Sequence, residues 1–139
     1  MKNSILASPS LNTDLATLAL RLIFGGLFVY HGYTKLLAYE QILPMFPDFI
    51  GIGSKTSFNL VIFAELFCGF FIMVGFLTRL SVIPIFITML VAYFMAHGAD
   101  AFDKKELPFL FLVLCIVVFI LGSGKYSIDR LIFKEKILR

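Results

Sequence analysis

The chain has 139 residues, of which 60% are hydrophobic and 15% are charged, whereas soluble domains are about half apolar and about a quarter charged. This length allows one domain, and the apolar excess excludes an ordinary soluble fold and predicts a protein embedded in lipid. The formal net charge of +3 comes from basic residues near the C-terminus without an arginine-rich face, which excludes nucleic-acid binding.

Four apolar stretches are candidates for helices that cross a hydrocarbon core of about 30 Å, which takes about 20 residues at a rise of about 1.5 Å per residue. They predict an all-α membrane protein, a bundle of four transmembrane helices that forms a single domain over residues 1–139. The predicted spans are residues 15–37, 58–77, 80–97 and 107–121.

The segments between and after the spans predict how the bundle is completed. Only Thr78 and Arg79 separate the second span from the third, so these helices form a tight antiparallel hairpin with Thr78 as the predicted N-cap. Residues 38–57 are apolar but contain prolines and glycines, which predicts an interfacial or re-entrant loop covering one mouth of the bundle. The tail, residues 122–139, ends in a predicted short amphipathic helix on the membrane surface.

The distribution of lysine and arginine predicts the orientation of the spans. Most basic residues belong to the two termini and to the hairpin loop, so we expect both termini and this loop to be cytoplasmic. The basic residues on this side are Lys2, Arg79, Lys125, Arg130, Lys134, Lys136 and Arg139, against Lys35, Lys55, Lys104 and Lys105 on the other side.

The first span carries charged residues in a regular pattern. Charged groups at membrane depth cost about 3 kcal/mol and tend to face a bundle interior. Arg21, Gly25, Phe28, Gly32 and Lys35 recur at steps of four and three, which places them on one helical stripe facing the other helices. The glycines of this stripe would let a neighbouring helix or a flat ligand approach the backbone closely.

Glu65, in the second span, needs a partner at its own depth. His31 and Lys35 at the outer end of the first helix, and His97 at the outer end of the third, are expected at comparable depth. The predicted topology places Glu106 at the rim of the same region and Arg21 closer to the cytoplasm. The predicted ligand pocket therefore consists of Arg21, His31, Lys35, Glu65, His97 and Glu106.

Two interpretations of this polar cluster are open. Its members can pair to lock the helices together, or they can form a pocket that binds a ligand or moves protons, with Glu65 and His31 handling the proton. His31 and His97 could also ligate a haem iron from opposite helices. The position of His97 at a helix end and the absence of a Cys-x-x-Cys-His motif argue against haem. No dense metal-ligand set, phosphate-binding glycine loop or nucleophile motif is present in the sequence.

Several short motifs occur in order along the chain. They are Leu-Arg-Leu at 20–22, His31-Gly32 followed by Lys35, Ala64-Glu65 with Gly69, Gly75 through Thr78-Arg79, and the ending Gly122 to Arg130. In their order and spacing they resemble the DoxX family of small four-helix membrane proteins over about residues 18–131. Ser123 stands where the typical ending of that family has proline.

The resemblance implies a multi-pass protein of a bacterial inner membrane, with relatives associated with quinol oxidase and thiosulfate:quinone oxidoreductase assemblies and with resistance to quinone or oxidative stress. We therefore hypothesise an accessory or quinone-linked redox subunit that binds a quinone or another small amphipathic molecule beside other membrane subunits. If the chain is an enzyme, it is a quinone-linked oxidoreductase subunit. Two alternatives stay open: a non-enzymatic scaffold that docks a soluble redox partner, and a small proton-coupled transporter, which would require a homo-oligomer.

The closing motif also has a structural interpretation that needs no family. The glycines of Gly122–Gly124 terminate the fourth helix, Ser127 can cap the tail helix, and the Asp129 carboxylate suits the positive end of that helix. We also predict a structural ion pair between Arg79 and Asp129, or between Asp129 and Arg21, that ties the tail to the bundle.

Overall fold

The fold is described by a computed structural model that covers residues 8–137, so Lys2 and Arg139 of the orientation prediction lie outside the described residues. The described chain is helical and has no β-strand, which confirms the all-α prediction. Two short segments, Phe63–Cys68 (η2) and Ala92–Ala96 (η3), are π-helical turns, and Leu43–Met45 (η1) is a 3-10 turn. The helices in chain order are α1 Thr13–Leu37, α2 Tyr39–Ile42, η1 Leu43–Met45, α3 Ser54–Ile62, η2 Phe63–Cys68, α4 Gly69–Val74, α5 Thr78–Val91, η3 Ala92–Ala96, α6 Phe102–Leu121 and α7 Ile128–Ile137.

Three helices within the described residues are long and apolar enough to cross a membrane. They are α1, the continuous helix Ser54–Val74 formed by α3, η2 and α4, and the continuous helix Thr78–Ala96 formed by α5 and η3. Helix α6 has 20 residues, but its uncharged part, residues 107–121, rises only about 22 Å, less than the core thickness of about 30 Å. The crossing of α6, and with it the count of four spans, therefore stays a prediction.

The ends of two helices differ from the predicted spans for local reasons. The second span is predicted at 58–77, whereas its helix runs from Ser54 to Val74. It ends there because Gly75 adopts a left-handed conformation with φ of 76° and the Phe76 N–H bonds back to the Phe71 carbonyl, the usual helix-ending arrangement. Helix α6 begins at Phe102 rather than at 107, because a helix can continue through a charged turn that a hydropathy criterion excludes.

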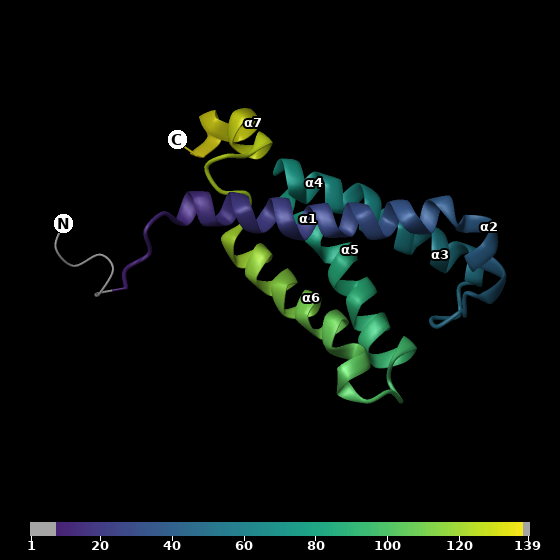
Figure 1. The fold of residues 1–139 in the computed structure, drawn as a ribbon. Helices are drawn as coiled ribbons and strands as arrows, with labels where there is room; N and C mark the ends of the chain where they lie inside the picture. Colours follow the sequence, from purple (N-terminus) through teal and green to yellow (C-terminus); the bar gives the residue numbers. More distant parts are fainter. Residues whose placement is uncertain (1–7, 138–139) are drawn as a thin grey trace.

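The helices form two pairs that meet at the end of the molecule where α7 lies (Figure 1). Helix α1 runs beside α3, η2 and α4, and α5 runs beside α6. The second pair lies obliquely to the first, so the connection between η3 and α6 is separated from the loop that contains α2 (Figure 1). Helices α4 and α5 are joined by the predicted tight turn, residues 75–77.

The predicted stripe of α1 is the face that packs against the rest of the protein. Glycine is required on it, because a Cβ at Gly25 would lie 2.6 Å from the Gly69 carbonyl oxygen and one at Gly32 would lie 2.5 Å from the Leu66 nitrogen. Such distances are too short for a real Cβ, so glycine lets α1 approach α4 and η2 at backbone distance. The buried residues of α1 are Thr17, Arg21, Phe24, Gly25, Phe28 and Gly32.

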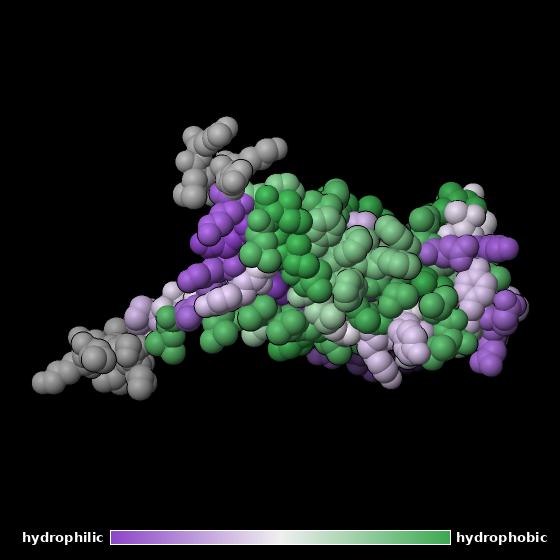
Figure 2. Space-filling model, turned by 90° about the horizontal axis from the view of Figure 1, so that it is seen from above, coloured by the Kyte–Doolittle hydropathy of each residue, from purple (hydrophilic) through white to green (hydrophobic). Residues whose placement is uncertain are grey.

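The outer surface of the long helices is apolar. Large side chains are open on it, with Ile23 64% exposed, Leu80 63% and Ile120 68%. Figure 2 shows this apolar surface as a broad band bounded at both ends of the molecule by hydrophilic residues. Soluble monomers rarely expose contiguous apolar patches of this extent, so the band is the surface that contacts lipid.

Asp129 lies in the first turn of α7, as predicted, and its carboxylate also caps the start of α5. It accepts hydrogen bonds from the backbone N–H groups of Leu77 (2.8 Å) and Thr78 (3.4 Å) and from the Ser123 hydroxyl. The predicted N-cap role of Thr78 is wrong, because Leu77 occupies the N-cap position in a left-handed conformation with φ of 47°. Ser127 caps α7 as predicted, since its hydroxyl accepts from the Arg130 N–H (3.2 Å).

The two arginines predicted to pair with Asp129 bind backbone carbonyls instead. Arg79 donates to the carbonyls of Phe119 (3.0 Å) and Ile120 (3.4 Å) at the end of α6, where a helix leaves its last carbonyls without intrahelical partners. Arg21 is 2% exposed and donates to the carbonyls of Ser123 and Tyr126. Within the described residues neither arginine forms an ion pair with Asp129. The tail is therefore tied to the bundle by hydrogen bonds to the backbone.

Replacing Asp129 with alanine should lower the free energy of unfolding by about 1 kcal/mol, because the first N–H groups of α5 lose their acceptor. The measurement is the melting of the purified protein in detergent. Glu106→Ala is the matched control, since Glu106 is exposed on α6. Equal shifts for the two variants would show that the cap contributes nothing.

Candidate functional site

A cavity of about 320 Å³ lies between the two helix pairs. We call it the Glu65 cavity. Its polar lining comes from four helical segments: His31 and Lys35 on α1, Glu65 on η2, Thr88 on α5, and His97 directly after η3. Its apolar lining includes four phenylalanines from α1, α6 and the loop after α2, namely Phe28, Phe46, Phe49 and Phe111.

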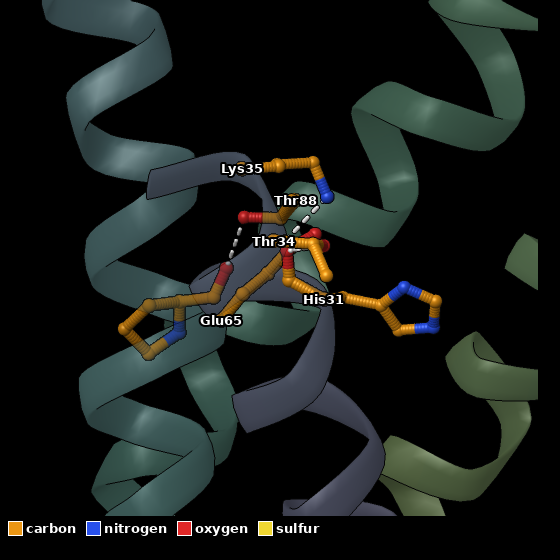
Figure 3. A network of polar contacts seen from close by, with 6 residues as sticks. His31, Thr34, Lys35, Glu65 and Thr88 are labelled. Carbon is orange, nitrogen blue, oxygen red and sulfur yellow. Dashed lines mark hydrogen bonds and ion pairs between the residues drawn. The ribbon is translucent and has the colours of Figure 1, made fainter. Parts of the chain in front are cut away.

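Lys35 and Glu65 form an ion pair on the wall of this cavity. The Lys35 Nζ lies 2.5 Å from the Glu65 Oε2, as the dashed line in Figure 3 marks. The Glu65 side chain is 5% exposed and that of Lys35 is 29% exposed, so the carboxylate is shielded while the ammonium reaches the cavity from its edge. A buried carboxylate of this kind is costly unless a cation neutralises it, and Lys35 supplies that cation.

Local backbone features bring the pair together. Glu65 belongs to the π-helical turn η2, and such turns widen a helix at one point and occur frequently at functional sites. Gly32 lies about one turn before Lys35 on α1 and contacts the backbone at Leu66, directly beside Glu65. The close approach at Gly32 therefore places Lys35 within reach of the Glu65 carboxylate.

The two histidines lie on the same cavity but are held apart from the ion pair. The His31 ring points away from Lys35 and Glu65 (Figure 3) and packs edge-on against Phe111, with 6.2 Å between ring centroids. His97 Nδ1 lies 2.8 Å from the Asp100 carboxylate. A proton passing between Glu65 and His31 would therefore need an intermediate carrier such as water or a bound ligand.

Four of the six residues of the predicted pocket line the Glu65 cavity, and two do not. His31, Lys35, Glu65 and His97 line it. Glu106 is exposed on α6, and Arg21 is buried at the opposite end of α1, where it binds the turn before α7.

The sequence reasoning missed Thr88 and the phenylalanines as lining residues. Thr88 is an isolated polar residue in an apolar stretch, and that isolation was a signal. In the structure its hydroxyl donates to the Pro84 carbonyl (2.9 Å) one turn earlier, a contact that tends to bend helices. Phe46 and Phe49 come from the loop predicted to cover one mouth of the bundle, and both line the cavity.

Comparison with known proteins places this architecture in a family. The DoxX family model matches residues 16–98, more than half of the chain. The chain belongs to the DoxX family. The matched segment of this DoxX protein contains the four ionisable residues that line the Glu65 cavity, namely His31, Lys35, Glu65 and His97. Helices α6 and α7 follow the matched segment. The chain is a membrane protein of this family, in agreement with the names of its Mycobacterium tuberculosis and Escherichia coli relatives.

Three relatives show how far the similarity extends. An uncharacterized membrane protein of Mycobacterium tuberculosis is 27% identical, covering 86% of this chain and 83% of that protein. The inner membrane protein YqjF of Escherichia coli is 30% identical, covering 88% of this chain and 95% of that protein. A Bacillus subtilis protein named "Putative oxidoreductase CatD" is 27% identical, covering 88% of this chain and 91% of that protein. No solved structure matches the chain.

Proposed function

We propose that the Glu65 cavity binds a quinone or a similar small amphipathic molecule and that the chain is an accessory or quinone-linked subunit of a membrane redox or oxidative-stress system. The observation behind this proposal is a cavity with aromatic walls that contains one shielded ion pair. Its volume of about 320 Å³ is at the lower end of the range of ligand pockets. Such a volume suits a single ring head group whose apolar tail extends into lipid.

The chemistry of the lining supports a ring with carbonyl oxygens. Phe28 and Phe111, with ring centroids 4.7 Å apart, offer aromatic surface for a flat ring. The Lys35 ammonium has three donors and uses one on Glu65, so it can donate another to a ligand oxygen. A reduced ring releases protons when it is oxidised, and the Glu65 carboxylate is an acceptor at that edge of the cavity. The electrons would pass to or from a partner redox protein.

The names of two relatives agree with a redox function in the inner membrane. The Bacillus subtilis relative is named "Putative oxidoreductase CatD", and the Escherichia coli relative is named an inner membrane protein. We also propose an inner-membrane location with α6 as a fourth span, and the distribution of lysine and arginine supports cytoplasmic termini. A cysteine introduced at Ser10 should not react with an impermeant thiol reagent added outside intact cells. Labelling of this cysteine would show that the N-terminus lies outside and that the proposed orientation is wrong.

A non-enzymatic scaffold is the rival function. The ion pair joins α1 directly to η2, so it can serve only to hold two helices together. In that case the cavity would be a by-product of packing, and the protein would act by docking a soluble redox partner. Substitution of Glu65 would then change stability and leave ligand binding unaffected.

Quinone binding by the Glu65→Gln variant distinguishes these two functions. We expect the purified wild-type protein to bind a short-chain ubiquinone, measured by titration calorimetry in detergent. Glu65→Gln should bind it about tenfold more weakly, a loss of about 1.4 kcal/mol, because the ion pair with Glu65 holds the Lys35 ammonium at the cavity wall. Glu106→Gln is the matched control, because Glu106 lies outside the cavity. Equal affinity of Glu65→Gln, Glu106→Gln and wild type would overturn the proposal and favour the scaffold. A Soret band in the same sample would instead point to haem on His31 and His97.

A further inference from the structure

A second and larger cavity, of about 600 Å³, lies between α7 and the ends of α5 and α6. We call it the α7 cavity. It is at the opposite end of α1 from the Glu65 cavity, where the two helix pairs meet (Figure 1). None of its lining residues belongs to the Glu65 cavity, so it is a separate site that the proposed function leaves unused.

The α7 cavity carries an excess of positive charge. Arg79, Arg130 and Lys134 line it together with one carboxylate, Asp129. That carboxylate is already engaged by the N–H groups at the start of α5 and by the Ser123 hydroxyl.

The two cations of α7 that line the cavity are available to a ligand. Arg130 and Lys134 are four residues apart on α7, which puts them on one face of the helix. Their side chains are exposed and have no hydrogen-bond or ion-pair partner among the side chains of residues 8–134, the range over which the structure describes side chains. Two neighbouring cations without partners on a cavity wall are suited to an anion with several acceptor oxygens, such as a phosphate group.

The rim of the same cavity is apolar. Leu80, Leu121 and Phe133 line it, and Leu80 is 63% exposed, so this edge continues into the apolar band of the outer surface. Figure 2 shows the junction, with hydrophilic residues at the end where α7 lies directly beside that band. A ligand that fits must therefore present an anionic group to α7 and an apolar group to the outer surface of α5.

We propose that the α7 cavity binds the phosphate of an anionic phospholipid. Arg130 and Lys134 contact the phosphate oxygens, and the acyl chains run past Leu80 along the apolar surface. Basic pockets beside membrane helices bind anionic head groups in this manner. A free phosphate would satisfy the cations but would leave the apolar rim uncovered, which is why the lipid is the better occupant. Through α7 and the Asp129 cap, such a lipid would also hold the tail against α5.

The test measures binding of phosphatidylglycerol to the full-length protein by native mass spectrometry from detergent. We expect one phosphatidylglycerol to be retained in preference to phosphatidylcholine. The variant Arg130→Gln/Lys134→Gln should bind it about 25-fold more weakly, from a loss of about fivefold for each cation. The matched control is Lys104→Gln/Lys125→Gln, which removes the same charge from two exposed residues outside the cavity and should leave binding within about twofold of wild type.

Three results would overturn the proposal. Equal weakening in both double variants would show that general electrostatic attraction, rather than a site, holds the lipid. Equal retention of phosphatidylcholine and phosphatidylglycerol would show that charge is not recognised. Glycerol phosphate binding as tightly as phosphatidylglycerol would show a site for a soluble phosphate ester. Both double variants change exposed side chains, and their melting temperatures check that each is folded.

Discussion

Replacing Lys35 with methionine should lower the free energy of unfolding by about 3 kcal/mol, because it leaves the Glu65 carboxylate shielded and without a cation. The Glu65 side chain is only 5% exposed and its ion-pair partner is Lys35. Methionine is unbranched and only one atom shorter than lysine, so the variant removes the charge while it preserves most of the packing of the stem. Denaturation in mixed detergent micelles measures the free energy.

Two further variants separate the ion pair from the other contacts of its members. Lys35→Met/Glu65→Leu should recover most of the loss, since removing both charges leaves no unpaired carboxylate. Lys55→Met is the matched control, because Lys55 is exposed in the first turn of α3 and its loss should cost less than about 0.5 kcal/mol. If Lys35→Met were no more destabilising than Lys55→Met, the pair would contribute nothing to folding.

This series also sharpens the choice between ligand pocket and scaffold. The double variant would be a folded protein that lacks both charges of the Glu65 cavity. A scaffold would keep its stability and its partner in that variant, whereas a quinone site would lose affinity because the lining no longer offers a donor. The double variant therefore separates the two functions: its stability shows that it is folded, and its ligand affinity falls only if the cavity is a quinone site.

Burial of a charge is a strong constraint on a sequence, and it led to the grouping of four residues that line one cavity in the structure, His31, Lys35, Glu65 and His97. Glu65 in an apolar stretch requires a cation at its depth, and the positions of His31, Lys35 and His97 near the outer helix ends limit the choice. The structure selects Lys35 among them. The rotation of each helix about its axis decides which of these residues meets Glu65, and hydropathy alone does not predict this rotation.

The helix boundaries are less predictable, since they depend on interactions between distant parts of the chain. The start of α5 is capped by Asp129, about fifty residues later in the sequence, so no local pattern around Thr78 could identify its cap. The π-helical turn η2 has no hydropathy signature either. The oblique packing of the two helix pairs (Figure 1) and the Glu65 cavity between them involve segments that lie far apart in the sequence.

The close contact between α1 and α4 is the second feature with a large expected effect. Gly25→Ala should lower the free energy of unfolding by about 2–3 kcal/mol, because the added Cβ would lie 2.6 Å from the Gly69 carbonyl oxygen and 2.7 Å from the Met73 nitrogen. Both neighbours are backbone atoms, so the helices must separate to accept it. Thermal melting of the purified protein measures the change.

Gly26→Ala provides the matched control one position away on the same helix. A Cβ at Gly26 would have only the flexible Met73 sulfur near it, at 3.9 Å. Alanine also favours a helix by about 0.5–1 kcal/mol over glycine, so this variant should be as stable as wild type or slightly more. A smaller loss for Gly25→Ala than for Gly26→Ala would contradict the contact. The same stripe of glycines positions Lys35. Separation of α1 from α4 in Gly25→Ala should therefore also lower the affinity of the Glu65 cavity for its ligand.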